Sequence, residues 1–145
     1  MLPAPHRLRE DRVIKRVMAR GQYVSAPTLV VRIASGQSKK TRATVVAGLR
    51  VHKRANERNL VKRRVREALR ALLPEIKSGL DIVVTARAEA VGKSFSDLGN
   101  DLYEALLRLG VIPVEKFRQD TDRKIIHGAQ GTAKTNQDKL RRSMK

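Results

Sequence analysis

Apolar residues recur along this chain at two spacings, one typical of helices and the other typical of strands. The first helical spacing is set by Val13, Ile14, Val17 and Met18. Because glycine often ends a helix and Gly21 follows this segment, the pattern predicts a first helix over about 9–20.

Runs rich in β-branched residues come next, at 28–34 and 44–51, and a polar stretch that includes Gly36 separates them. Val, Ile and Thr favour strands, so we interpret the two runs as strands and expect them to pair with each other. A third run, 80–87, follows Gly79 and predicts another strand, with at least one face buried.

Two longer amphipathic segments alternate with these strands. The first predicts a helix over 55–73 that ends at Pro74, and its apolar stripe is Val61, Val65, Ala68, Leu69 and Leu72. The second begins with Ser96 as the expected N-cap and ends before Gly110, and its stripe is Leu98, Leu102, Ala105, Leu106 and Leu109. Each stripe is expected to pack onto the sheet.

The order helix, strands, helix, strand, helix predicts an α+β fold, a small sandwich of helices against one sheet. The pattern alone does not fix the order of the strands. The chain has 145 residues, enough for one domain of ordinary size, which we place at 1–113. The remaining segment, 114–145, is basic and poor in apolar residues, and we expect a mostly disordered tail there.

Composition narrows the possible partners of this fold. Lys and Arg number 32 against 14 Asp and Glu, so the formal net charge is +18. Such an excess favours a polyanionic partner, either a nucleic acid or an anionic membrane. No apolar run approaches the roughly 20 residues of a membrane span and the start resembles no signal peptide, so we expect a soluble cytoplasmic protein without a membrane partner. The absence of cysteine excludes disulfides and thiol ligands.

The densest cluster of charge lies on the segment 53–70. Lys53 and Arg54 precede the predicted helix, and on the helix one sector of about 140° carries the candidate RNA-binding side chains. These are Arg58, Asn59, Lys62, Arg63, Arg66 and Arg70. Only Glu57 and Glu67 interrupt the run, so most of these cations lack an acidic partner on the helix. A row of phosphate contacts is one interpretation, and a solvated helix face is the other.

The spacing of this cluster resembles the signature of the bacterial ribonuclease P protein family. The matching residues are Arg58-Asn59, Lys62-Arg63 and Arg66. The resemblance begins at His6-Arg-Leu-Arg, includes 79–87 and covers roughly residues 5–112. Two departures stand out: His52-Lys53-Arg54 replaces the family's common Ser-Lys-Lys, and Leu60 replaces a residue that is often basic.

The resemblance implies a fold like the second domain of ribosomal protein S5, with an unusual left-handed β-α-β crossover. It also implies two partners, a catalytic RNA held by the basic helix and a precursor tRNA whose 5′ leader lies in a cleft formed by the first helix, the sheet and the second helix. Ile14 and Met18 correspond to positions at that cleft, although burial in the core explains them equally well. The expected cofactor is Mg²⁺, held largely by RNA.

No residue of the chain is assigned a catalytic role, because no nucleophile–base pair or cluster of metal-binding carboxylates is present. His6, His52 and His127 are far apart in sequence, and Asp120 and Asp122 lie in the predicted tail. Three other functions are weighed against the family's. A ribosomal or other structural RNA-binding protein would carry the same charge, whereas DNA binding lacks a helix-turn-helix pattern and a stand-alone nuclease lacks its carboxylates.

Overall fold

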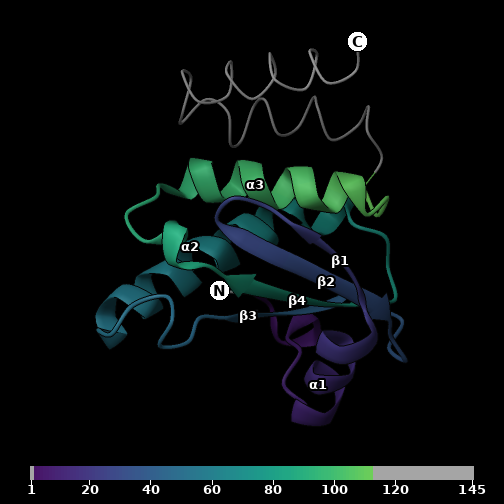
Figure 1. Ribbon diagram of the computed structural model, residues 1–145. Coiled ribbons are helices and arrows are strands. Elements are labelled where there is room, and N and C mark those ends of the chain that lie inside the picture. The colour runs from purple at the N-terminus through teal and green to yellow at the C-terminus, as the bar shows by residue number, and fades with distance from the viewer. Residues whose placement is uncertain (1, 113–145) are drawn as a thin grey trace.

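The computed structural model describes residues 2–112, which form one four-stranded sheet with helices on both faces (Figure 1). The helices are α1 (Asp11–Arg20), α2 (Ala55–Leu72) and α3 (Phe95–Arg108), with short 3₁₀ turns at Ala4–His6, Leu73–Glu75 and Ala88–Ala90. The strands are β1 (Gln22–Ser25), β2 (Leu29–Ser35), β3 (Arg42–Val46) and β4 (Leu80–Ala86). The predicted α+β class is therefore confirmed, whereas the predicted tail, 114–145, lies outside the described residues.

The strand order is β1-β2-β4-β3, with β4 antiparallel to β2 and parallel to β3. The prediction that the runs 28–34 and 44–51 pair with each other is therefore wrong, because β4 lies between β2 and β3. The middle of β4, formed by Ile82, Val83 and Val84, is fully apolar and has no exposed surface. A central position in the sheet explains this, because both faces of a central strand can be covered. The unit β3-α2-β4 is a parallel crossover, and its hand stays a prediction.

The main core lies between the sheet and the helices α2 and α3. On the sheet side it contains Leu29, Val31, Ile33, Ala43, Val45, Ile82, Val84 and Ala86. The predicted stripes of both helices pack against these residues, and Leu69, Leu98, Leu102 and Leu106 are fully buried. Burying each such side chain contributes roughly 1.5–3 kcal/mol, so this layer supplies most of the hydrophobic stabilisation.

The opposite face of the sheet carries α1, and Figure 1 shows α1 and α3 on opposite sides of the strands. A second, smaller cluster forms there from Leu8, Val13, Val17 and Val83. We call this side the α1 face. Since side chains alternate along a strand, Tyr23, Val30, Arg32, Asp81 and Thr85 all belong to it.

Two local predictions are wrong in the structure, and a third is confirmed for a different reason. The strand predicted at 44–51 ends at Val46, and the chain turns there, with the Val51 amide donating to the Gly48 carbonyl. The N-cap of α3 is Ser94 rather than Ser96, because the Ser94 hydroxyl accepts from the Asp97 amide. Gly21 does end α1, but its φ of −70° is ordinary. A side chain at Gly21 would instead meet the Val17 and Ile33 carbonyl oxygens at 2.5 and 2.7 Å.

Candidate nucleic-acid interface

Helix α2 separates its apolar and basic residues as the sequence predicts. The stripe Val61, Val65, Ala68, Leu69 and Leu72 is buried against the sheet and α3. Around the rest of the helix, Asn59, Arg63 and Arg70 are exposed, and Arg58, Lys62 and Arg66 are half-buried. The packing of one face therefore fixes the direction of the other, so the basic side chains form a row along an anchored helix.

The cations of this row differ in what they contact. The side chains of Lys62 and Arg66 make no hydrogen bond or salt bridge with another residue of the described part of the chain. Arg58 does, because its Nη1 donates to the carbonyl oxygens of both His52 and Lys53, each at 2.9 Å. The His52 ring accepts from the Arg54 amide at 2.9 Å in the same turn. Arg58 therefore fastens the segment that displays Lys53 and Arg54, a role that its spacing did not reveal.

A hollow of about 570 Å³ lies along the outer surface of α2. Its lining residues are Asn56, Glu57, Asn59, Leu60, Arg63, Arg66 and Glu67. Three predicted RNA-binding residues are thus brought together with both acidic residues of the helix. The row is therefore chemically mixed, because amide and carboxylate groups, which are able to contact base edges, lie among the cations.

The two candidate leader residues, Ile14 and Met18, take different places. Ile14 is half-buried and packs against the second cluster, so the core interpretation fits it well. Met18 is 39% exposed, and its sulfur accepts from the Thr85 hydroxyl at 3.9 Å. Met18 therefore lies over β4 at the edge of the area that α1 covers.

Sequence reasoning missed two residues of the α1 face, Tyr23 and Arg32. Tyr23 is 65% exposed, and the Arg32 guanidinium lies over its ring, 5.7 Å from the ring centroid. They are register partners on β1 and β2. The strand β1 has only four residues and Val24 is its one partly buried position, so its signal is weak. The one available sign of a strand was that Tyr23 and Val24, as neighbours, would point to opposite faces of a sheet.

Comparison with known proteins decides what this arrangement belongs to. A family model described as ribonuclease P matches residues 2–110, almost the whole described chain. The chain belongs to the ribonuclease P protein family. The ribonuclease P protein component of Chloroflexus aurantiacus is 34% identical over 109 residues, which cover 74% of this chain and 80% of that protein. That of Symbiobacterium thermophilum is 35% identical, over 76% and 96% respectively.

Solved structures of the ribonuclease P protein family have the same fold. The protein from Staphylococcus aureus superposes with a TM-score of 0.67 at 23% identity, covering 74% of this chain and 98% of that one. The protein from Thermotoga maritima gives a TM-score of 0.61 at 26% identity, covering 68% and 92%. The family's mixed sheet, with α2 and α3 on one side and α1 on the other, is therefore the architecture of this chain.

Two of the remaining candidate residues, His6 and His52, have structural contacts in this member of the ribonuclease P protein family. His6 Nδ1 lies 2.7 Å from the Thr41 carbonyl oxygen, and His52 belongs to the turn before α2. Within residues 2–112, no group of three or more His, Cys, Asp or Glu side chains is placed to hold a metal ion. Across the same residues, every helix is too short or too polar to cross a membrane. His127, Asp120 and Asp122 lie outside the described residues.

Proposed function

We propose that this chain is the protein subunit of ribonuclease P, the endoribonuclease that removes the 5′ leader of precursor tRNA. In this proposal the basic row of α2 binds the catalytic RNA, and the open part of the α1 face binds the leader. The chemistry takes place on the RNA, and the chain supplies binding and orientation. The observation that supports this most directly is the basic row on an anchored helix, in a chain of this family.

The row is suited to a folded RNA backbone. Arginine forks bind phosphates bidentately and lysine acts as a point charge, so the mixture accommodates irregularly spaced phosphates. The residues assigned to this surface are Lys53, Arg54, Arg58, Asn59, Lys62, Arg63, Arg66 and Arg70. Since α2 is packed along its whole length, little conformational entropy of the backbone is lost on binding.

The leader is assigned to the part of the α1 face that α1 leaves open. Met18, Tyr23, Arg32 and Thr85 are the side chains proposed to contact it, and Ile14 supports them from the second cluster. We call these four residues the leader surface. A methionine, an exposed ring and a guanidinium offer unpaired bases apolar contact, stacking and a phosphate contact. These interactions tolerate different bases, which suits leaders that differ in sequence.

Mg²⁺ is assigned to the RNA subunit and the substrate, whose phosphate oxygens are hard ligands of the kind that this ion prefers. The donor groups of the described residues do not fit a metal site on this chain. We accordingly assign no catalytic residue and no metal-dependent step to the protein.

The deciding experiment is cleavage of 5′-labelled precursor tRNA at near-physiological Mg²⁺ by the protein, by the cognate RNA and by the two together. We expect cleavage to require the RNA and to be accelerated by the protein. RNA-independent cleavage would instead indicate a nuclease. Tight RNA binding without acceleration would indicate a ribosomal or other structural RNA-binding protein.

A further inference from the structure

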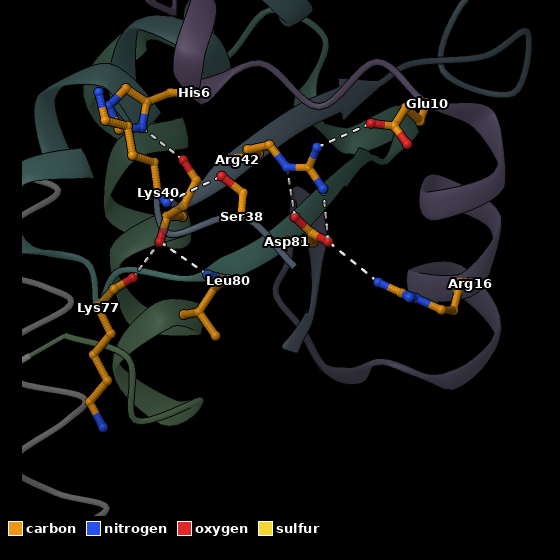
Figure 2. A network of polar contacts seen from close by, with 10 residues as sticks. His6, Glu10, Arg16, Ser38, Lys40, Arg42, Lys77, Leu80 and Asp81 are labelled. Carbon is orange, nitrogen blue, oxygen red and sulfur yellow. Dashed lines mark hydrogen bonds and ion pairs between the residues drawn. The ribbon is translucent and has the colours of Figure 1, made fainter. Parts of the chain in front are cut away.

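One charged side chain of the described chain is completely buried, and it lies on the α1 face. Asp81 has no exposed side-chain surface. Its Oδ1 accepts from Arg42 Nε at 3.1 Å and its Oδ2 from Arg42 Nη2 at 3.4 Å (Figure 2). A third nitrogen, Nη2 of Arg16, lies 3.5 Å from Oδ2. Gly36 closes the remaining side, because a Cβ there would be 2.8 Å from Oδ1.

These contacts join three elements through one carboxylate. Arg42 comes from β3, where it is the register partner of Asp81, and Arg16 comes from α1. Arg42 also reaches Glu10, the residue before α1, at 3.3 Å. Its hydrogen bond with Asp81 raises the pKa of the Arg42 guanidinium above its ordinary value, against the opposing effect of burial. A buried carboxylate is tolerated only with such partners, so the network holds α1 to the sheet.

The network and two residues of the leader surface, Met18 and Thr85, lie on opposite sides of α1. Asp81, Val83 and Thr85 follow one another on the same face of β4. Val13 and Val17 of α1 pack on Val83 in the middle. Arg16 extends from one side of the helix to Asp81, and Met18 extends from the other side to Thr85. A rotation or shift of α1 over Val83 would therefore move Met18 relative to the strands.

We infer that Asp81 is a positioning residue for leader binding: through Arg42 and Arg16 it fixes α1, and with it Met18, at a set place over the sheet. This inference rests on the proposed function, because it concerns the same leader surface. Asp81 itself is buried and touches no RNA. Its effect reaches the leader only through the placement of α1.

The test uses the reconstituted holoenzyme with wild-type protein or the Asp81→Asn variant. The dissociation constants for precursor tRNA with its leader and for mature tRNA are measured, and their ratio is the leader discrimination. We expect Asp81→Asn to reduce this ratio roughly fivefold to tenfold, the size of effect that losing one base contact has. Affinity for the RNA subunit should change less than about twofold, because α2 lies on the other side of the sheet.

Two further variants separate positioning from loss of stability. Asp101 hydrogen-bonds the Thr28 amide and hydroxyl away from α1, so Asp101→Asn is the matched control and should leave discrimination unchanged. The double variant Asp81→Asn/Arg42→Gln replaces the ion pair by a neutral amide pair and should recover part of the discrimination. Equal losses in Asp81→Asn and Asp101→Asn, with matching drops in melting temperature, would overturn the inference.

Arg16→Gln covers the case in which Asp81→Asn does not fold. The Arg16 side chain is 41% exposed, so its replacement should be tolerated. We expect a twofold to threefold loss of discrimination, about the value of one exposed ion pair, with no change in salt dependence. A lower salt slope would instead identify Arg16 as a phosphate contact and would overturn its positioning role. If wild-type holoenzyme shows no leader discrimination, the proposed leader binding is wrong. If wild type discriminates and Asp81→Asn and Arg16→Gln discriminate equally well, only the inference about Asp81 is wrong.

Discussion

The two faces of the sheet are covered to very different extents. Beneath α2 and α3, the inward residues of β2 and β4 are almost completely buried, from Leu29 and Val31 to Ile82 and Val84. On the other side, α1 has only ten residues and covers the middle of the sheet. Val30, Arg32 and Thr85 stay partly accessible there, and Tyr23 is largely exposed.

In the proposed function, this difference gives the two RNA-binding surfaces different kinds of side chain. A face that two helices cover completely leaves only the outer surfaces of those helices for binding, so α2 presents long cationic side chains. A face that one short helix covers in part leaves strand side chains accessible, so the leader surface presents a ring, a thioether and a guanidinium. The first surface is expected to depend strongly on salt, and the second mainly on shape and stacking.

The largest expected effect comes from removing the charge of α2. The triple variant Arg58→Ala, Lys62→Ala and Arg66→Ala should weaken binding of the RNA subunit about 100-fold near 0.15 M salt, if each side chain neutralises one phosphate. The slope of log affinity against log salt should fall by about two to three. Fluorescence titration at several salt concentrations measures both, and circular dichroism should show an unchanged fold.

A matched set on α1 tests whether location or total charge matters. Arg12, Lys15 and Arg20 are exposed on α1, and their replacement by Ala removes the same three charges. We expect less than about fivefold loss of RNA-subunit affinity, the part due to long-range attraction. Equal losses in the two sets would mean that the protein binds through its net charge and that α2 has no special role.

The next effect compares the two faces within one strand. Val31 is fully buried under α2 and α3, and its neighbour Val30 is only partly buried on the α1 face. Val31→Ala should lower the free energy of unfolding by roughly 2 kcal/mol, through lost transfer energy and a cavity. Val30→Ala should cost less than about 1 kcal/mol. Urea unfolding measures both, and similar values would show that the two faces contribute equally to stability.

The elements with long apolar stripes could be predicted from the sequence, because their signal is local. Helix α2 was expected to end at Pro74 and ends at Leu72, and β4 matches its predicted run closely. The order of the strands could not be predicted, since a strand's neighbour depends on contacts distant in sequence. The strand β1 was missed because four residues with one half-buried side chain give almost no periodic signal.

The candidate site was predictable in its charges but not in its contacts. The spacing placed Arg58, Lys62 and Arg66 on one side of a helix, and the structure agrees. That Arg58 also holds two carbonyl groups depends on the path of the preceding turn. Asp81 gave no signal at all, because its partners Arg42 and Arg16 lie 39 and 65 residues away. Which of several regularly spaced arginines makes a hydrogen bond within the protein is decided by the tertiary structure, and the spacing does not reveal it.

A smaller effect is expected where one arginine has two tasks. Arg58→Lys keeps the charge, but a single ammonium group cannot hold the His52 and Lys53 carbonyls and also bind a phosphate as a planar fork does. We expect about tenfold weaker binding of the RNA subunit. Arg63→Lys is the control, because Arg63 belongs to the same surface but holds no carbonyl of the preceding turn, and it should lose less affinity, about threefold. Equal effects would argue against the double role, and hydrogen exchange at 52–54 would report any loosening of the turn.

The smallest expected effect is on leader discrimination, and it tests the role of Tyr23 in the leader surface. Tyr23→Ala should reduce leader discrimination about fivefold, near the lower limit for one stacked base, because the Arg32 guanidinium already occupies one side of the ring. Tyr23→Phe keeps the ring and should retain discrimination. Leu49→Ala removes another exposed apolar side chain, 74% accessible and outside the leader surface, and should have no effect on the ratio. If Tyr23→Ala discriminates as well as wild type, the leader does not stack on β1, and its contacts must then lie closer to Met18 and Thr85, where α1 meets the sheet.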